Sequence, residues 1–480
     1  MTKIPFSDVL VLLPGITGSA LAKDGKEIWA PTGGAVLRSL LSFGGALKSL
    51  EVADDDWKQP HLGDGVTATR LMPDVHLLPG LWKIDGYGAV EKFLLDTFDL
   101  KENENYLPFP YDWRRDNRAS ARQLELASAE CLQRWRVKTN NPQAQLVLVG
   151  HSMGGLIARY FVECLEGWRD TRAVVTFGTP FYGSLNALEF LVSGFKKKFG
   201  PLSIDLSEML QSLRSVHQLV PAYKCVYSGG VAATPAAAGI PGWKPAWATA
   251  AREMAAEVEA AAMANRADPG FAANPTVYRP IVGTDQPTRQ SAVIDGDTVR
   301  IAWDRGGSDE QGDGTVPLLS AALAGTEDQR TFAPEQHARL QNYGSMLAHL
   351  KGVLSSLYQV RIDDVRSAAT AWFSYRADDV YLPSEPVTVQ LAGRSSVDES
   401  LLPEVKATLE VTDRATGELA RRLEMPVPRT LTDVDLGPLP PGSYTFEARG
   451  LPGTASLSDV LVVAGPEDLD PPDAEPHGER

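Results

Sequence analysis

Cysteine is scarce in this sequence. Only Cys131, Cys164 and Cys225 occur in 480 residues, and an odd number cannot pair completely. Two of them lie in helical patterns, where a small buried apolar residue serves equally well. We therefore expect no disulfide framework.

Basic charge is scarce as well. The chain has 46 lysines and arginines against 61 aspartates and glutamates, which gives a formal net charge of −15 and a pI near 5.0. A nucleic-acid-binding protein needs a basic surface to neutralise phosphates. Anionic lipid surfaces attract basic segments for the same reason. The charge balance argues against nucleic acid as a partner and disfavours bulk electrostatic attachment to membranes.

Long hydrophobic runs are missing. Residues 1–19 contain one short apolar run, without the longer apolar region and cleavage site of a signal peptide. No later run is long enough to cross a bilayer. We expect a soluble, cytoplasmic protein. The aspartates of the glycine-rich segment 306–314 do not match a calcium-binding loop, so we expect neither metal nor cofactor.

A strand, a tight turn and a helix form the centre of the sequence. An apolar run, Leu146 to Val149, meets Gly150-His151-Ser152-Met153-Gly154, and an amphipathic helix follows. A G-x-S-x-G turn between a strand and a helix is typical of a nucleophile elbow, which exposes the serine hydroxyl at the top of a sheet. Ser152 is therefore the candidate nucleophile.

A second glycine-bearing turn follows the first apolar strand. The strand, Asp8 to Leu13, runs into Pro14-Gly15-Ile16-Thr17-Gly18-Ser19. In an acyl-transfer enzyme, a backbone N–H from such a loop and that of the residue after the nucleophile stabilise the oxyanion. The candidates are Ile16 and Met153.

Two regions have the composition of insertions over a cleft, at about 29–85 and 190–265. Residues 29–50 are apolar and glycine-punctuated, which fits a buried helical hairpin or a movable lid equally well. For a lid, the residues facing the substrate would be Trp29, Leu40, Leu41 and Phe43. The helix expected at 246–266 is alanine-rich and mostly exposed.

The remaining segments predict two domains. Strands alternate with helices at 88–98 and 119–137, the pattern of a parallel sheet covered on both faces. We therefore expect a hydrolase domain over residues 1–365. Alternating apolar residues over 370–465 predict an immunoglobulin-like β-sandwich, and the acidic, proline-rich residues 466–480 a disordered tail.

Five segments together resemble one family. VLLPGITGS, FPYDWRRD, GHSMGGLIARYF, TFGTPFYGS and GDGTVPLLSA occur in the order seen in the lecithin:cholesterol acyltransferase and lysosomal phospholipase A2 family of α/β-hydrolases. The resemblance covers residues 8 to about 355. It implies acyl-ester chemistry on lipids, an oxyanion position at Ile16, an acid at Asp313 and a base at His337. The chain departs from the animal members in lacking their signal peptide and paired cysteines and in having a C-terminal extension.

The order of residues supports the same assignment. Serine needs a histidine to take its proton and a carboxylate to orient that histidine, and α/β-hydrolases carry them in the order serine, acid, histidine. Of the seven histidines, only His337 follows the acid in a loop or first helical turn. Asp309 and Asp304 are the nearest substitutes for Asp313.

The predicted function is a serine acyl hydrolase or O-acyltransferase acting on lipid esters, with phospholipase A-type cleavage favoured. The alternatives are an esterase or lipase for other esters, and an interaction protein that works through the β-sandwich. The expected partners are the lipid substrate, a membrane surface in transient contact and a protein bound by the sandwich. Because every catalytic candidate precedes residue 365, we expect the hydrolase part to cleave small esters by itself.

Overall fold

The structure is a computed structural model that describes residues 3–30, 50–73, 76–78, 82–199, 202–357, 371–378, 380–382, 385–395, 405–451 and 456–465. Three of the four predicted lid residues, Leu40, Leu41 and Phe43, lie outside the described residues, as does the tail 466–480. Within these ranges, no helix is long and apolar enough to cross a bilayer.

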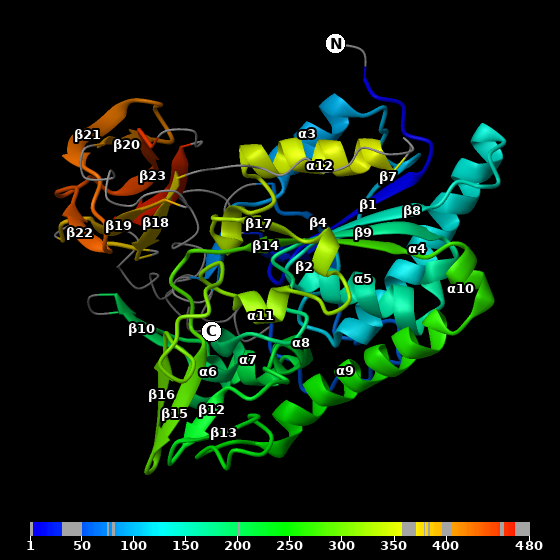
Figure 1. Ribbon diagram of the computed structural model, residues 1–480, viewed down its shortest axis with the longest axis horizontal. Coiled ribbons are helices and arrows are strands. Elements are labelled where there is room, and N and C mark those ends of the chain that lie inside the picture. Colours follow the sequence, from blue (N-terminus) through cyan, green and yellow to red (C-terminus); the bar gives the residue numbers. More distant parts are fainter. Residues whose placement is uncertain are drawn as a thin grey trace, which may run out of the picture.

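A six-stranded parallel sheet forms the centre of the molecule (Figure 1). Its order is β17-β14-β9-β8-β1-β7, and each neighbouring pair is parallel. The strands are β1 (Val9–Leu13), β7 (Tyr106–Pro108), β8 (Leu146–His151), β9 (Thr171–Phe177), β14 (Val277–Gly283) and β17 (Thr331–Ala333). Every residue of β1 and β8 is buried. Such continuous apolar runs are expected where helices cover both faces of a parallel sheet.

Helices cover the two faces of this sheet in separate layers (Figure 1). Helices α4 (Asn117–Thr139), α5 (Met153–Cys164) and α9 (Pro245–Arg266) lie on one side, and α3 (Gly88–Thr97) and α12 (Gly344–Ser356) on the other. The alternation of β1 sets the two cores, because Val9, Val11 and Leu13 pack in the first and Leu10 and Leu12 in the second. The predicted parallel sheet with two covered faces is confirmed.

Two helices differ from their predicted form. Helix α4 begins at Asn117 because the Asp116 side chain accepts a hydrogen bond from the Arg118 N–H at 2.9 Å, and it ends at Asn140 in the left-handed conformation. Helix α9, predicted to be mostly exposed, buries one face that includes Trp247, Met254 and Val258 and packs against α5. The alanine-rich sequence did not indicate the buried face of α9, because the small alanine side chain suits exposed and close-packed positions alike.

Shorter elements surround the central sheet. One three-stranded antiparallel sheet contains β2 (Ser19–Lys23), β3 (Lys26–Trp29) and β4 (Val66–Leu71), and a four-stranded sheet contains β12 (Val226–Ser228), β13 (Val231–Ala233), β15 (Ser291–Asp295) and β16 (Thr298–Ala302). The remaining elements of this part are β5 (His76–Leu78), β6 (Trp82–Ile84), β10 (Lys196–Phe199), β11 (Leu202–Asp205), α6 (Leu185–Ser193), α7 (Ser207–Ser212), α8 (Arg214–Gln218), α10 (Pro269–Ala273), α11 (Leu318–Ala321), and the 3-10 turns η2 (Gly167–Arg169), η3 (Glu327–Gln329) and η4 (His337–Arg339).

The C-terminal part consists of two antiparallel sheets, as the alternating pattern predicted. One contains β18 (Ala371–Ala377), β19 (Thr388–Ser395) and β22 (Thr432–Asp435). The other contains β20 (Lys406–Asp413), β21 (Leu419–Pro426), β23 (Gly442–Arg449) and β24 (Leu457–Val463). Side chains of both sheets, among them Val389, Leu409 and Phe446, share one apolar core. Figure 1 shows these strands on the β17 side of the central sheet.

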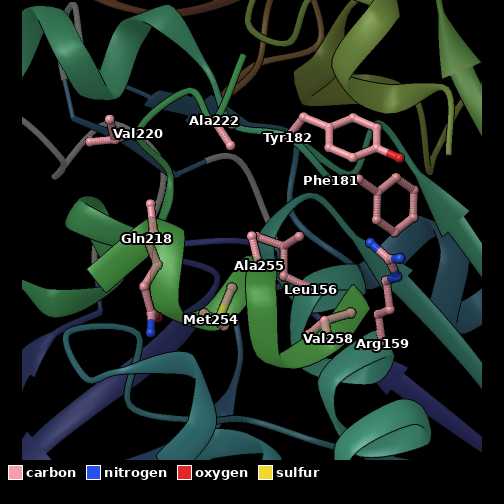
Figure 2. Close-up of a pocket in the computed structure, with 12 residues that line it drawn as sticks. Leu156, Arg159, Phe181, Tyr182, Gln218, Val220, Ala222, Met254, Ala255 and Val258 are labelled. Carbon is pink, nitrogen blue, oxygen red and sulfur yellow. The ribbon is translucent and has the colours of Figure 1, made fainter. Parts of the chain in front are cut away.

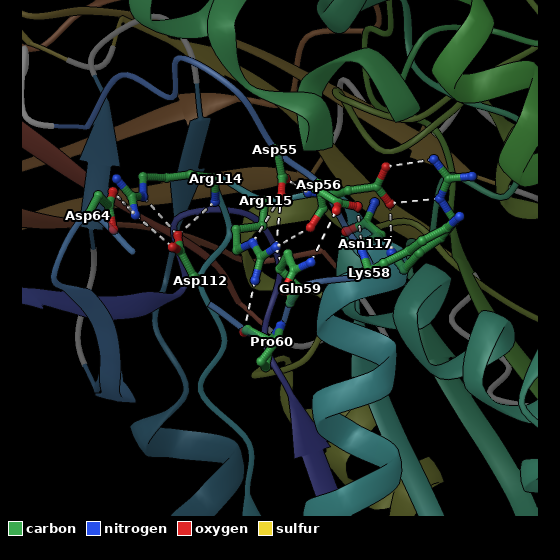
Figure 3. A network of polar contacts seen from close by, with 12 residues as sticks. Asp55, Asp56, Lys58, Gln59, Pro60, Asp64, Asp112, Arg114, Arg115 and Asn117 are labelled. Carbon is green, nitrogen blue, oxygen red and sulfur yellow. Dashed lines mark hydrogen bonds and ion pairs between the residues drawn. The ribbon is translucent and has the colours of Figure 1, made fainter. Parts of the chain in front are cut away.

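Buried ion pairs connect the segment 50–64 to the FPYDWRRD motif (Figure 3). The Arg114 guanidinium, which is fully buried, lies 2.7 Å from an Asp112 oxygen and 3.0 Å from an Asp64 oxygen. Arg115 pairs with Asp55 at 2.9 Å, and the second Asp55 oxygen accepts the Asp116 N–H at 2.6 Å. Removing one partner of such a buried pair costs about 3–5 kcal/mol. The network therefore fixes the chain where it leaves the predicted lid.

Candidate active site

Ser152 lies on a strained turn between β8 and α5. Its φ is +52°, a conformation that a residue with a side chain seldom adopts outside such turns. Its N–H donates to the Phe177 carbonyl oxygen at 2.8 Å, which fixes the turn to β9. A Cβ added at Gly154 would lie 2.5 Å from the Pro14 carbonyl oxygen, so only glycine allows this approach. The chain therefore holds the serine at the carboxyl end of the sheet.

The three residues predicted to act together do meet in space. The His337 Nε2 lies 2.9 Å from the Ser152 Oγ, and the His337 Nδ1 lies 2.7 Å from an Asp313 carboxylate oxygen. An ionised carboxylate only accepts, so the proton belongs on Nδ1 and Nε2 is left to accept the serine proton. All three side chains are buried, which strengthens their electrostatic interaction.

Backbone groups hold the acid in place. The second Asp313 oxygen accepts the N–H groups of Thr315 at 3.0 Å and Val316 at 2.7 Å. The substitutes considered for it bond elsewhere: an Asp309 oxygen accepts the Gln311 N–H, and an Asp304 oxygen the Gly307 N–H. Of the three aspartates, Asp313 is the one placed against His337.

A glycine not singled out in the sequence leaves room for this pair. Gly178 follows β9 with a φ of +54°, and a Cβ there would lie 2.7 Å from the Asp313 carboxylate and 2.8 Å from the His337 Nδ1. Any side chain would therefore enter the space of the hydrogen bond between them. The signal was present in the segment TFGTPFYGS, but nothing local indicates what a glycine faces across the fold.

Tyr87 was also missed by the sequence analysis. Its hydroxyl accepts the Gly15 N–H at 2.6 Å and lies 2.9 Å from the His151 Nδ1. The oxygen accepts one bond and the proton donates the other, so the phenol joins the glycine turn after β1 to the nucleophile turn. Complete burial raises the pKa of Tyr87, which keeps the hydroxyl protonated.

The predicted oxyanion residues border the nucleophile. A Cβ added at Gly15 would lie 3.0 Å from the Ser152 Cβ, so the Pro14–Ser19 turn touches the serine. Ile16 and Met153 are both buried there, and their role in an oxyanion site stays a prediction. Trp29 is buried at the end of β3, and its indole N–H donates to the Thr17 carbonyl oxygen at 3.0 Å. Trp29 thus supports this turn, while its part in a lid is untested.

A mostly apolar pocket opens beside the nucleophile helix (Figure 2). Leu156, one turn after Ser152, and Phe181 line it on the side of the central sheet. Helix α9 supplies the facing wall with Met254 and Val258, so the region predicted as a second insertion does border the pocket. The volume of about 410 Å³ in and around this pocket includes open solvent, and the space enclosed by the lining side chains is only about 30 Å³, far below the range of small-molecule sites.

One cation lines this pocket. Arg159 is buried, its guanidinium lies 2.8 Å from a Glu259 oxygen, and it stacks over the Phe181 ring at 5.6 Å. Figure 2 shows it pointing along the pocket wall toward that ring. The ion pair engages one nitrogen of the guanidinium, whereas the Arg159 Nε is buried and has no hydrogen-bond partner among the described residues. The other lining residues are apolar except Gln218 and Tyr182.

A parallel sheet with a serine elbow at its carboxyl end is the architecture typical of α/β-hydrolases. The family model described as lecithin:cholesterol acyltransferase matches residues 83–260. This match confirms the resemblance predicted from the motifs and supports a lipid-ester hydrolase or acyltransferase. The matched stretch contains Ser152, whereas Asp313 and His337 lie beyond it.

Other comparisons give more distant likenesses. None of the curated proteins matches the sequence. Among solved structures, the Tle4–Tli4 complex is similar at 15% identity and a TM-score of 0.47, over 75% of this chain and 100% of that one. The Bacillus licheniformis lipase BlEst2 in propeptide form is similar at 11% identity and a TM-score of 0.32, over 96% and 95%. Phospholipase PlaB from Legionella pneumophila follows at 9% identity and 0.25, over 95% and 92%.

Proposed function

We propose that this protein is a serine acyl hydrolase or O-acyltransferase that cleaves lipid esters, with phospholipase A-type cleavage as its main reaction. The observation that carries the proposal is the chain of short contacts from the Ser152 hydroxyl through the His337 imidazole to the Asp313 carboxylate. A hydroxyl so placed becomes a nucleophile at neutral pH.

The geometry supports a two-step reaction. The Ser152 oxygen attacks the ester carbonyl carbon while the His337 Nε2 takes the serine proton, and Asp313 stabilises the imidazolium. The oxyanion accepts hydrogen bonds from the Ile16 and Met153 N–H groups. Its collapse breaks the bond to the leaving alcohol, which receives the proton from His337. Water or another alcohol then attacks the acyl-enzyme and gives its proton to His337. The second tetrahedral intermediate collapses by breaking the bond to the Ser152 oxygen, which takes the proton back from His337.

The apolar pocket is the proposed site of an acyl chain. Leu156, Phe181, Met254 and Val258 offer a hydrocarbon-like lining, and Leu156 lies one helical turn after Ser152. The pocket encloses only about 30 Å³, so it must widen to hold an acyl chain. Burial of a chain there stabilises the complex by about 0.8 kcal/mol for each CH₂ group.

We further propose that the two C-terminal sheets form an immunoglobulin-like β-sandwich. We also propose that the protein contacts membranes transiently, that the sandwich binds a protein partner, and that the protein is cytoplasmic.

A panel of esters tests the proposal. The wild-type protein and Ser152→Ala would be incubated separately with phosphatidylcholine vesicles, a triacylglycerol emulsion and a short soluble ester, with products followed by mass spectrometry. We expect lysophospholipid and free fatty acid from the wild type alone. Turnover of triacylglycerol without phospholipid would favour the lipase alternative. No turnover of any ester would favour the interaction protein.

A further inference from the structure

The C-terminal sheets contact the hydrolase domain through the free edge of strand β18. In its own sheet β18 pairs with β19 alone, so its other edge has backbone groups to satisfy. The Gln286 side chain satisfies two of them. Its Nε2 donates to the Phe373 carbonyl oxygen and its Oε1 accepts the Tyr375 N–H, each at 3.4 Å. The glutamine amide thus replaces a neighbouring strand.

Two further bonds extend this contact. The Ser374 hydroxyl donates to the Asp285 carbonyl oxygen, and the Gln336 Nε2 donates to the Tyr375 carbonyl oxygen at 3.2 Å. Gln286, Ser374 and Tyr375 are at most 3% exposed. Breaking one of these hydrogen bonds is costly as long as the boundary stays closed, because the buried polar groups lose their partner and water cannot replace it.

Both glutamines lie next to predicted catalytic residues. The Gln286 N–H donates to the Gly312 carbonyl oxygen at 3.0 Å, and Gln286 pairs with Asp313 as an isolated parallel bridge. Gln336 directly precedes His337, whose N–H donates to the Asp313 carbonyl oxygen at 2.8 Å. Strand β18 therefore contacts Gln286, which is bonded beside Asp313, and Gln336, which precedes His337.

Apolar packing and charge strengthen the same contact. Val460 and Val462 of β24 belong to the apolar cluster that contains the α5 side of the hydrolase core, and Val380 and Leu382 pack against that cluster. On the other side, the Asp459 carboxylate attracts the half-buried Arg339 guanidinium and raises its pKa. Asp459 also raises the pKa of the buried Glu335 carboxyl group, and Glu335 and Arg339 flank His337. Interfaces between domains are commonly more polar, and allow more relative motion, than this contact between the C-terminal sheets and the hydrolase domain.

We infer that the C-terminal domain positions the catalytic loops, with Gln286 and Gln336 as the positioning residues through which β18 holds Asp313 and His337 against Ser152. The inference rests on the proposed function and assigns the C-terminal domain a part in the reaction. It is opposed to our expectation from the sequence that residues 1–365 cleave small esters unaided, which stays a prediction. Catalytic groups require placement within about 0.5 Å, and a displacement of about 1 Å costs roughly 100-fold in rate.

Full-length Gln286→Ala and Gln336→Ala test the inference on a short soluble ester. We expect kcat to fall about 10- to 100-fold with KM unchanged, because neither side chain lies among the residues lining the apolar pocket. Gln390→Ala is the matched control, since this glutamine bonds Asp433 between β19 and β22 without contact to the catalytic loops. It should retain the wild-type kcat.

The outcomes separate this inference from the proposed function. If the wild type hydrolyses the ester and both glutamine variants keep its kcat, or lose activity through KM alone, the positioning role is wrong while the hydrolase function stands. An equal loss in Gln390→Ala would also overturn it, because general weakening of the domain would then explain the effect. If Gln286→Ala fails to fold, the half-buried Gln336→Ala decides. A wild type without activity would instead contradict the proposed function.

Discussion

The His151 Nε2 lies 3.0 Å from the main-chain carbonyl oxygen of His337. The carbonyl only accepts, so His151 carries its proton on Nε2 and its Nδ1 accepts the Tyr87 hydroxyl proton. The residue before the predicted nucleophile thereby holds the backbone of the predicted base. This histidine is unavailable as a base itself, which agrees with its exclusion on sequence grounds.

The first prediction concerns the Tyr87 hydroxyl group, which joins Gly15 to His151. Tyr87→Phe leaves the Gly15 N–H and the His151 Nδ1 without their partner in a buried site. We expect the free energy of unfolding to fall by about 1–3 kcal/mol and kcat on a soluble ester to fall about 10-fold, as about 1.4 kcal/mol of transition-state stabilisation is lost. Urea denaturation and steady-state kinetics measure the two effects.

Tyr106→Phe is the control for that change. Tyr106 is also fully buried, and its hydroxyl donates to a Glu91 oxygen at 3.1 Å. This bond is not part of the series of hydrogen bonds that joins Gly15, Tyr87, His151 and His337. It should lose stability and keep its kcat. Equal kcat values in both variants would mean that the Tyr87 hydroxyl has no part in positioning.

The second prediction is that Gly178→Ala lowers kcat by about 100-fold or more, because its methyl group displaces the Asp313–His337 pair. Gly229→Ala is matched in backbone strain, with a φ of +55° against +54°, but no atom lies within 4 Å of its added Cβ. Strain should therefore lower the melting temperature of both variants, whereas the steric clash should lower the activity of Gly178→Ala alone. A similar loss in both would contradict the steric account.

The third prediction follows from a buried carboxyl group beside the site. Glu335 is 1% exposed, and its pKa rises from 4.5 to about 7, mainly because of burial. The Arg339 charge and the Gln336 N–H oppose this rise, and Asp459 and Asp85 contribute to it. Between pH 4.5 and 7 the folded protein keeps a proton that the unfolded chain has lost. This stabilisation is complete below pH 4.5 and disappears as the pH rises through 7.

Glu335→Gln removes that dependence, because an amide stays neutral. At pH 8 the variant should be more stable than the wild type by up to about 3 kcal/mol, since each pKa unit corresponds to about 1.4 kcal/mol. At pH 4.5 the two should be alike. Melting temperatures across this range measure the difference, and a variant that is no more stable at pH 8 would show that the carboxyl group is ionised without cost.

The fourth prediction concerns the segment 29–50. If it is a lid, polar substitutions at Leu40, Leu41 and Phe43 should reduce activity on vesicles far more than on a short soluble ester, because an open lid presents these side chains to the lipid surface. Equal losses on both substrates with a lowered melting temperature would show that the segment is ordinary core. The cover would then belong to residues 190–265, where α9 already borders the pocket.

Local patterns accounted for much of the fold and for the candidate residues. The elbow around Ser152 was recognisable because strand, turn and helix are contiguous. The family resemblance implied Asp313 and His337, and chain order supported that assignment. Gly178, Tyr87 and Gln286 were not recognisable. Their importance depends on segments up to 159 residues away, as for Gly178 and His337, and no spacing within either segment indicates that approach. Helix α9 was predicted, but its buried face was not, because alanine suits exposed and close-packed positions alike.

The central claim is that Ser152 is a nucleophile activated by His337 and Asp313. Intact-mass and peptide analysis after treatment with a fluorophosphonate tests it most directly. The account predicts a single adduct on Ser152, none in Ser152→Ala, and labelling slower by orders of magnitude in His337→Ala and Asp313→Ala but not in Asp309→Ala or Asp304→Ala. An adduct on another residue, or unchanged labelling after loss of His337, would contradict it.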